Sequence, residues 1–143
     1  MDNNIYKLRD LLSSMKITLN KLLKIENEKT TVLEKGSVEE LDEIIVKEQA
    51  LIMECSSFEK ERIEICSRLN AKSVSELYEL YPESKEIVGH VHEEMIETIN
   101  QIKKASAVNM QLLDTKLKLV RFITSQLGGN TEYSTYDKKA HLI

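Results

Sequence analysis

Tryptophan is absent from this 143-residue sequence, and residues that make turns are scarce, with four glycines and one proline. Aromatic residues amount to only 5%. Sheet folds need frequent turn residues and many β-branched or aromatic side chains, so this composition argues against them. No glycine stands in a GxGxxG or GxxxxGK[ST] arrangement, which excludes the Rossmann and Walker phosphate-binding loops. The composition favours a single domain of long helices.

An excess of positive charge and long apolar runs are also missing. The formal net charge is −4 and the pI about 5.5, and no basic stripe is interleaved with aromatic residues, so nucleic acid is a poor partner. No apolar run approaches the roughly 18 residues of a membrane span. The polar start, Met1–Asn4, lacks the basic and apolar blocks of a signal peptide. We therefore expect a cytoplasmic protein that does not insert into membranes.

The cysteines and histidines form no pattern typical of catalysis or metal binding. Cys55 and Cys66 lie on one expected helix, about 16 Å apart along its axis, too far to bridge each other. We interpret them as buried thiols in a reducing compartment, with a reactive or metal-binding role as the alternative. The Glu-x-x-His pairs of di-iron bundles are absent, although His90 and Glu94 could together bind an adventitious ion. We expect no enzymatic activity, no cofactor and no metal site.

Apolar residues at spacings of three and four predict a first helix from Ile5, with a seam interrupted by Glu26 and Lys29: Ile5, Leu8, Leu12, Met15, Leu19, Leu22 and Leu33. Residues 35–37 should end it, because Gly36 suits a left-handed position and Ser37 can cap the next helix. The capping box from Ser37 to Glu40 starts a second helix at about residue 38. So short a link demands an antiparallel hairpin.

A second capping box, from Ser73 to Glu76, opens a short helix through Leu80, which Pro82 ends or redirects. No proline follows up to Leu127, and the apolar spacing there predicts a third long helix, which Gly89 could bend. We predict an all-α, elongated, up-down-up antiparallel bundle: a long helical hairpin plus a longer third helix, with a short connecting helix. Residues 1–129 form the bundle domain, and residues 130–143 a flexible C-terminal tail.

The third long helix should outrun the hairpin. About 45 residues span nearly 68 Å, against about 48 Å for each hairpin helix. Its last part remains apolar over a wide arc, so we expect an uncovered surface that binds another chain, formed by Leu112, Leu113, Leu117, Leu119, Val120, Ile123 and Leu127. The alternative is that this end is ordinary core because Gly89 shortens or bends the helix.

Charge and polar seam residues predict how the helices align. The second helix is acidic, and residues 101–127 carry five bases against Asp114, so the basic end should lie beside the acidic start of the second helix. Glu48, Arg62 and Asn109 stand where core residues are expected. Pairing about Gly36 places Arg62 near Asp10, and Glu48 near Lys24 or Ile25. Buried pairs would fix the register, whereas the alternative is long side chains that reach solvent.

The order of these features resembles the FlgN family of flagellar export chaperones. Its hairpin pattern matches Leu22-Leu23-Lys24-Ile25-Glu26, the Gly36 turn, Leu41, Lys47 and Glu59-Lys60-Glu61-Arg62. Its Asn-x-x-Leu-Leu position matches Asn109-Met110-Gln111-Leu112-Leu113, and a tail with tyrosines follows. The resemblance covers nearly the whole chain.

The resemblance implies a cytoplasmic chaperone that binds the C-terminal helical segments of the hook-associated proteins FlgK and FlgL and delivers them to the export gate protein FlhA. Clients would bind the C-terminal part of the chain, where Lys116, Lys118 and Arg121 would steer acidic client residues. Tyr133 or Tyr136 would dock on the gate. The alternatives are a structural helical adaptor or coiled-coil homo-oligomer that uses the same apolar end, and a sister chaperone of the FliT type.

Overall fold

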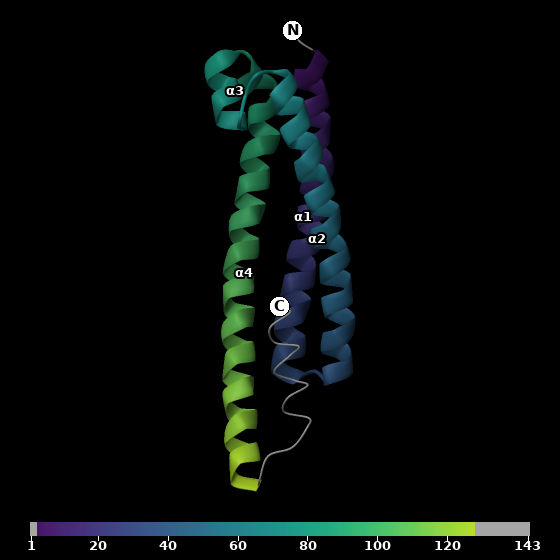
Figure 1. Cartoon of the computed structure of the whole chain (residues 1–143), viewed down its shortest axis with the longest axis vertical. Coiled ribbons are helices and arrows are strands. Elements are labelled where there is room, and N and C mark those ends of the chain that lie inside the picture. Colours follow the sequence, from purple (N-terminus) through teal and green to yellow (C-terminus); the bar gives the residue numbers. More distant parts are fainter. Residues whose placement is uncertain (1–2, 128–143) are drawn as a thin grey trace.

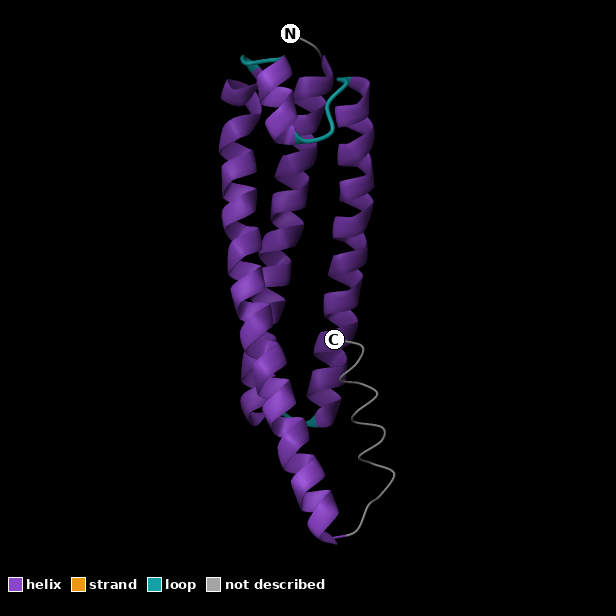
Figure 2. Cartoon of the chain, turned by 60° about the vertical axis from the view of Figure 1, so that its left-hand side comes forward, coloured by secondary structure: helices purple, strands orange, loops and turns teal. Residues whose placement is uncertain are grey.

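A computed structural model describes residues 3–127 and places them in four helices, with no strand in this range. The helices are α1 (Asn3–Lys35), α2 (Val38–Arg68), α3 (Val74–Leu80) and α4 (Ser84–Leu127). α1 and α2 form an antiparallel hairpin, and α4 runs alongside it and past its turn (Figure 1; Figure 2). The predicted up-down-up bundle is confirmed. The predicted tail, residues 130–143, lies outside the described residues.

The helix boundaries follow from local capping chemistry, as the sequence predicted. The hydroxyl of Ser37 accepts a hydrogen bond from the Glu40 amide at 3.2 Å, and the hydroxyl of Ser73 accepts one from the Glu76 amide at 3.1 Å. These bonds satisfy amides that the first helical turn leaves without a partner. Asn70, at a φ of 58°, reverses the chain after α2 in the left-handed region that asparagine tolerates.

α1 is the shared packing partner of the other two long helices. Both α2 and α4 pack along it, whereas α3 packs on the start of α4. The main apolar cluster, called here the upper core, lies at the end of the bundle that carries α3 (Figure 1). Its buried members come from all four helices and the α2–α3 connection: Ile5, Leu8, Leu11, Leu12, Met15, Leu19, Ile65, Cys66, Leu69, Ala71, Val74, Leu77, Val88 and Met95.

Gly36 serves close approach rather than the left-handed conformation that the sequence analysis predicted. Its φ lies outside the left-handed region. Its amide donates to the Val32 carbonyl at 2.7 Å, and a Cβ added at this position would lie 2.8 Å from the same oxygen. α4 continues unbroken through Gly89, where an added Cβ would meet Lys85 Cγ at 3.4 Å. The turn therefore requires its glycine, and the helix does not.

These two glycines give a matched pair of variants. Gly36→Ala should lower the free energy of unfolding by about 1–3 kcal/mol, because its Cβ meets backbone that cannot yield cheaply. Gly89→Ala should raise it by about 0.5–1 kcal/mol, because alanine is the better helix former and its Cβ meets the flexible Lys85 side chain at 3.4 Å and the Tyr78 hydroxyl at an ordinary contact distance of 3.8 Å. Urea unfolding followed by circular dichroism measures both. Equal stabilities of the two variants would contradict this interpretation.

Two predicted pairings are wrong. Arg62 does not meet Asp10, because it folds back along its own helix, where its Nε donates to Glu59 at 2.8 Å and a terminal nitrogen approaches Cys66 Sγ at 3.9 Å. Asp10 instead pairs with its neighbour Arg9 at 3.1 Å. Glu48 does not meet Lys24 or Ile25 but Lys29, one turn further along α1. The alternative that Glu48 reaches solvent is also wrong, since it is buried.

Candidate functional site

A buried polar layer crosses the middle of the bundle, formed by Glu26, Lys29, Thr30, Glu48 and Asn109. The Lys29 ammonium, 1% exposed, donates to both Glu48 carboxylate oxygens at 3.1 and 3.2 Å. The Asn109 amide nitrogen donates to the Glu26 carbonyl and to Glu26 Oε2, both at 2.9 Å. Thr30 Oγ1 donates to Asn109 Oδ1 at 2.5 Å. The layer thus connects α1 to α2 and to α4.

Two carboxyl groups, Glu26 and Glu48, lie near the single ammonium group of Lys29, which bonds Glu48. Burial, with a further contribution from the neighbouring Glu48, raises the pKa of Glu26 from its ordinary 4.5 to about 7, and the opposing effects of Asn109 and Lys29 are smaller. Glu26 therefore holds its proton near neutral pH more readily than an exposed glutamate. A protonated Glu26 carboxyl can still form hydrogen bonds with its neighbours, and it does not add a second negative charge to the buried layer.

A second and smaller apolar cluster lies between the polar layer and the hairpin turn. Its buried members, called here the lower cluster, are Leu33 of α1, Leu41 of α2, and Leu113 and Leu117 of α4. Three half-buried side chains pack around them: Val32, Ile45 and Leu112. A small cavity of about 40 Å³ opens beside the cluster between Gly36, Val38 and the stem of Lys116, among other residues of the turn. The basic end of α4 thus reaches the acidic start of α2, as the charge pattern predicted.

Beyond the turn, no other helix within residues 3–127 lies beside α4. Residues 118–127 add about 15 Å of helix after the level of the turn, and both views show this end projecting past the hairpin (Figure 1; Figure 2). Three large apolar side chains are exposed there: Leu119 at 58%, Phe122 at 63% and Ile123 at 47%. We call these three residues the tip surface. Isolated exposed apolar side chains are common, but three within five residues of a projecting helix end make this surface a candidate for binding.

The structure divides the predicted client-binding residues into two groups. Leu113 and Leu117 are buried in the lower cluster, and Leu112, Lys116 and Val120 are half-buried. Leu119 and Ile123 are exposed, as is Arg121. The side chain of Leu127 and both predicted gate-docking residues, Tyr133 and Tyr136, lie outside the described part of the chain.

Phe122 was missed by the sequence analysis. It lies just outside the predicted apolar arc, beside Leu119 at the edge of that arc, so a criterion based on one helical face leaves it out. A helix end that projects from its bundle is exposed on every side, and there an apolar residue on any side is a binding candidate. Phe122 is one of two phenylalanines in the chain, and its place in the expected overhang was the available signal.

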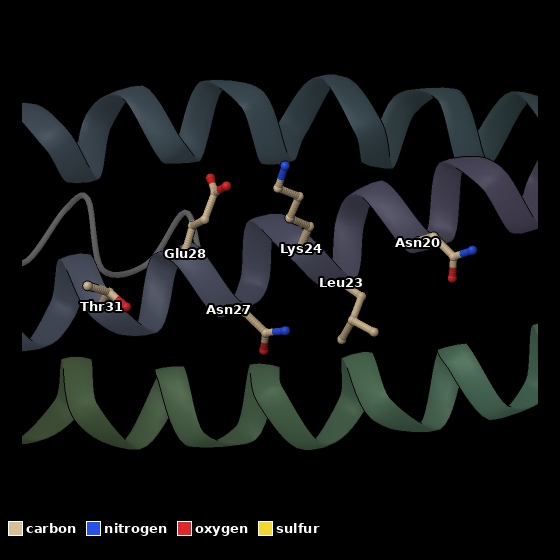
Figure 3. A pocket seen from close by; sticks show the side chains of 6 residues that line it. All are labelled: Asn20, Leu23, Lys24, Asn27, Glu28 and Thr31. Atoms are coloured by element: carbon tan, nitrogen blue, oxygen red, sulfur yellow. The ribbon is translucent and has the colours of Figure 1, made fainter.

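Other surface features offer weaker candidates. A shallow groove of about 500 Å³ runs along the outer face of α1 between α2 and α4 (Figure 3). It is lined by Asn20, Leu23, Lys24, Asn27, Glu28 and Thr31, all from α1. His90 Nε2 does pair with Glu94 Oε1 at 2.7 Å, and Glu94 also bonds Lys16. Within residues 3–127, no three His, Cys, Asp or Glu side chains gather closely enough to hold a metal ion.

None of the helices described is both long and apolar enough to cross a bilayer. Among the exposed apolar side chains of residues 3–127, those of the tip surface lie where α4 projects past the hairpin (Figure 1).

Comparison with known proteins gives one match. The family model described as FlgN protein matches residues 1–142, and no curated protein and no solved structure matches the chain significantly. The motif positions quoted for the resemblance contact one another in the structure: Glu26 accepts from Asn109, and Glu59 accepts from Arg62. The match spans the whole predicted bundle, and on it the chain belongs to the FlgN family, a family of flagellar export chaperones.

Proposed function

We propose that this chaperone acts in the cytoplasm, binds the C-terminal helical segments of the hook-associated proteins FlgK and FlgL, keeps them from assembling early and delivers them to the export gate protein FlhA. The observation that carries the proposal is the tip surface, Leu119, Phe122 and Ile123, exposed on a helix end that projects beyond its bundle. An amphipathic client helix can bury these side chains by laying its apolar face along α4.

Charge supports the same kind of partner. Residues 101–127 carry Lys103, Lys104, Lys116, Lys118 and Arg121 against the single acid Asp114, a net charge of +4. Lys118 pairs with Asp114 at 3.0 Å, and both side chains are well exposed, so a client carboxylate can exchange into this contact at little cost. Basic residues beside an apolar surface accelerate the encounter with an acidic amphipathic segment.

The tail is proposed to serve a different step. Tyr133 and Tyr136 follow the tip surface by fewer than fifteen residues, and one of them would dock on FlhA while the client occupies α4. This arrangement places client and gate contacts on consecutive parts of the chain.

The test is a double variant of the tip surface, Phe122→Asp with Ile123→Asp. We expect the affinity for the C-terminal segment of FlgK to fall by at least about 100-fold in calorimetry, because buried aromatic and aliphatic contacts dominate such interfaces. Helical content and melting temperature should not change, since both side chains are exposed. Leu117→Asp is unsuitable as a probe because Leu117 is buried in the lower cluster.

The matched control is Val46→Asp with Met53→Asp on α2. These two side chains are 69% and 71% exposed and apolar, but they lie away from the tip. The control should bind the FlgK segment with unaltered affinity. Unaltered affinity of the tip variant, or an equal loss in the control, would remove the proposed surface. Self-association would give a different result: the mass of the free protein would rise with its concentration, and the tip variant would have a lower mass at the same concentration. That outcome would indicate a homotypic adaptor instead.

A further inference from the structure

On α4, the buried leucines of the lower cluster lie on the same side of the helix as Val120, with Ile123 of the tip surface at the edge of that side. Leu117 lies about one turn and Leu113 about two turns before Val120 on α4, and the residues that cover them are Leu33 and Leu41 at the end of the hairpin. The lower cluster has four buried members, whereas the upper core has fourteen. The hairpin end is therefore held to α4 by far fewer apolar contacts than the rest of the molecule.

The polar layer separates the lower cluster from the upper core. Its links between helices are hydrogen bonds and one ion pair: Lys29 to Glu48, and Asn109 to Glu26. Water can replace such bonds when a structure opens, whereas exposed leucines gain no substitute. Just above the layer, α4 carries the small side chains Ala105 and Ser106, both half-buried. Separation of the helices below this level would leave the upper core intact.

We propose that the hairpin end and the part of α4 below Asn109 separate as a local opening, and that the client helix binds the lower cluster in this open form together with Ile123, the tip-surface residue nearest to that side of α4. The proposal rests on the proposed function, since it names how the same site is completed. Opening makes Leu33, Leu41, Leu113 and Leu117 available, so the four buried residues become a client groove that is closed in the free protein.

The charges of the two walls define the occupant. The α4 wall carries Lys116 and Lys118, and the opposing start of α2 carries Glu39, Glu40 and Glu43. A helix between them is best matched if one flank is acidic and the other basic, with an apolar stripe between. The groove is thus fitted to an amphipathic client helix with acidic residues toward α4.

Thiol labelling tests the opening in the full-length protein. In a Cys55→Ala/Cys66→Ala background, cysteines are introduced one at a time at two matched pairs of buried sites. On α4 the pair is Leu117→Cys in the lower cluster and Met95→Cys in the upper core, and on α1 it is Leu33→Cys and Leu12→Cys. Each labelling rate is divided by the rate of the same variant unfolded in urea. Both lower sites should react at least about tenfold faster than their upper partners.

The C-terminal segment of FlgK then tests the docking. At saturation it should slow labelling at both lower sites by at least about tenfold and leave the two upper sites unchanged. Two lower positions on different helices are used so that a cavity made by one substitution cannot produce the result alone.

Three outcomes would count against the proposals, and they differ. Equal labelling at lower and upper sites would show that the lower cluster opens only when the whole protein unfolds, which overturns the inference while binding to the tip stands. Fast labelling that the bound FlgK segment does not slow would confine the client to the tip and overturn the docking claim. Failure of the segment to bind any of the variants or the unmodified chain would remove the proposed function and the docking claim together.

Discussion

Replacing Lys29 by methionine should lower the free energy of unfolding by about 3–5 kcal/mol. This is the largest effect that we expect of a single substitution that leaves the side-chain volume about the same. The Lys29 ammonium is 1% exposed and lies within 3.2 Å of both Glu48 carboxylate oxygens. Without it, the carboxylate of Glu48 remains buried between helices with no cation to balance it. Urea unfolding of Lys29→Met at pH 7.5 measures the loss.

A control and a rescue separate the charge effect from packing. Lys21→Met, an exposed position on the same helix, should change stability by less than about 0.5 kcal/mol. Lys29→Met combined with Glu48→Met removes both charges and should recover most of the loss, because an apolar pair of similar volume can replace a buried ion pair. A cost for Lys29→Met no greater than that of Lys21→Met would contradict the buried pair.

The helix boundaries could be predicted from the sequence because they depend on neighbouring residues. Ser37 and Ser73 cap their helices through bonds to residues three positions on, and the short link at Gly36 leaves an antiparallel hairpin as the solution. The overhang of α4 followed from helix lengths alone. These features need no knowledge of which residue on one helix faces which on another.

The partners of the polar side chains could not be predicted in the same way. Counting an equal number of residues in both directions from the Gly36 turn pairs Thr18 with Glu54. These two residues do meet, since the Thr18 hydroxyl donates to Glu54 Oε1 at 2.8 Å. The same counting fails for Glu48, because the long Lys29 side chain reaches across more than one turn of helix. The counting also fails for Arg62, because Glu59 on the same helix is a closer partner than a residue on the neighbouring helix.

The candidate site was predicted in part for a related reason. Lengths indicated that α4 overhangs, but they do not give the level at which it meets the turn. That level decides that Leu117 is covered by Leu33 and Leu41 and that Leu119 is not. Contact between Glu26 and Asn109 likewise depends on the alignment of α1 with α4, although both residues stand in the motifs that first suggested the family.

The raised pKa of Glu26 makes the stability of the fold depend on pH. The carboxyl titrates near 4.5 in the unfolded chain and at about 7 in the folded protein. Between these values the folded protein holds a proton that the unfolded chain has lost, so the stabilising contribution is complete below pH 4.5 and is lost as the pH rises through 7. The change from pH 5 to pH 8 should be about 2–3 kcal/mol.

Glu26→Gln isolates this contribution. Glutamine has the shape and neutrality of the protonated carboxyl, so the difference in unfolding free energy between the original protein and the variant should fall by that amount between pH 5 and pH 8. Burial lowers the pKa of His92, which makes stability rise with pH, but His92 is present in both proteins and its effect cancels in the difference.

The control is Glu34→Gln, at an exposed position on the same helix. It should give a difference in unfolding free energy that does not change with pH. A flat difference for Glu26→Gln would mean that the polar layer holds an ionised Glu26 without cost. Two carboxylates and one ammonium, buried together, make that outcome physically unfavourable.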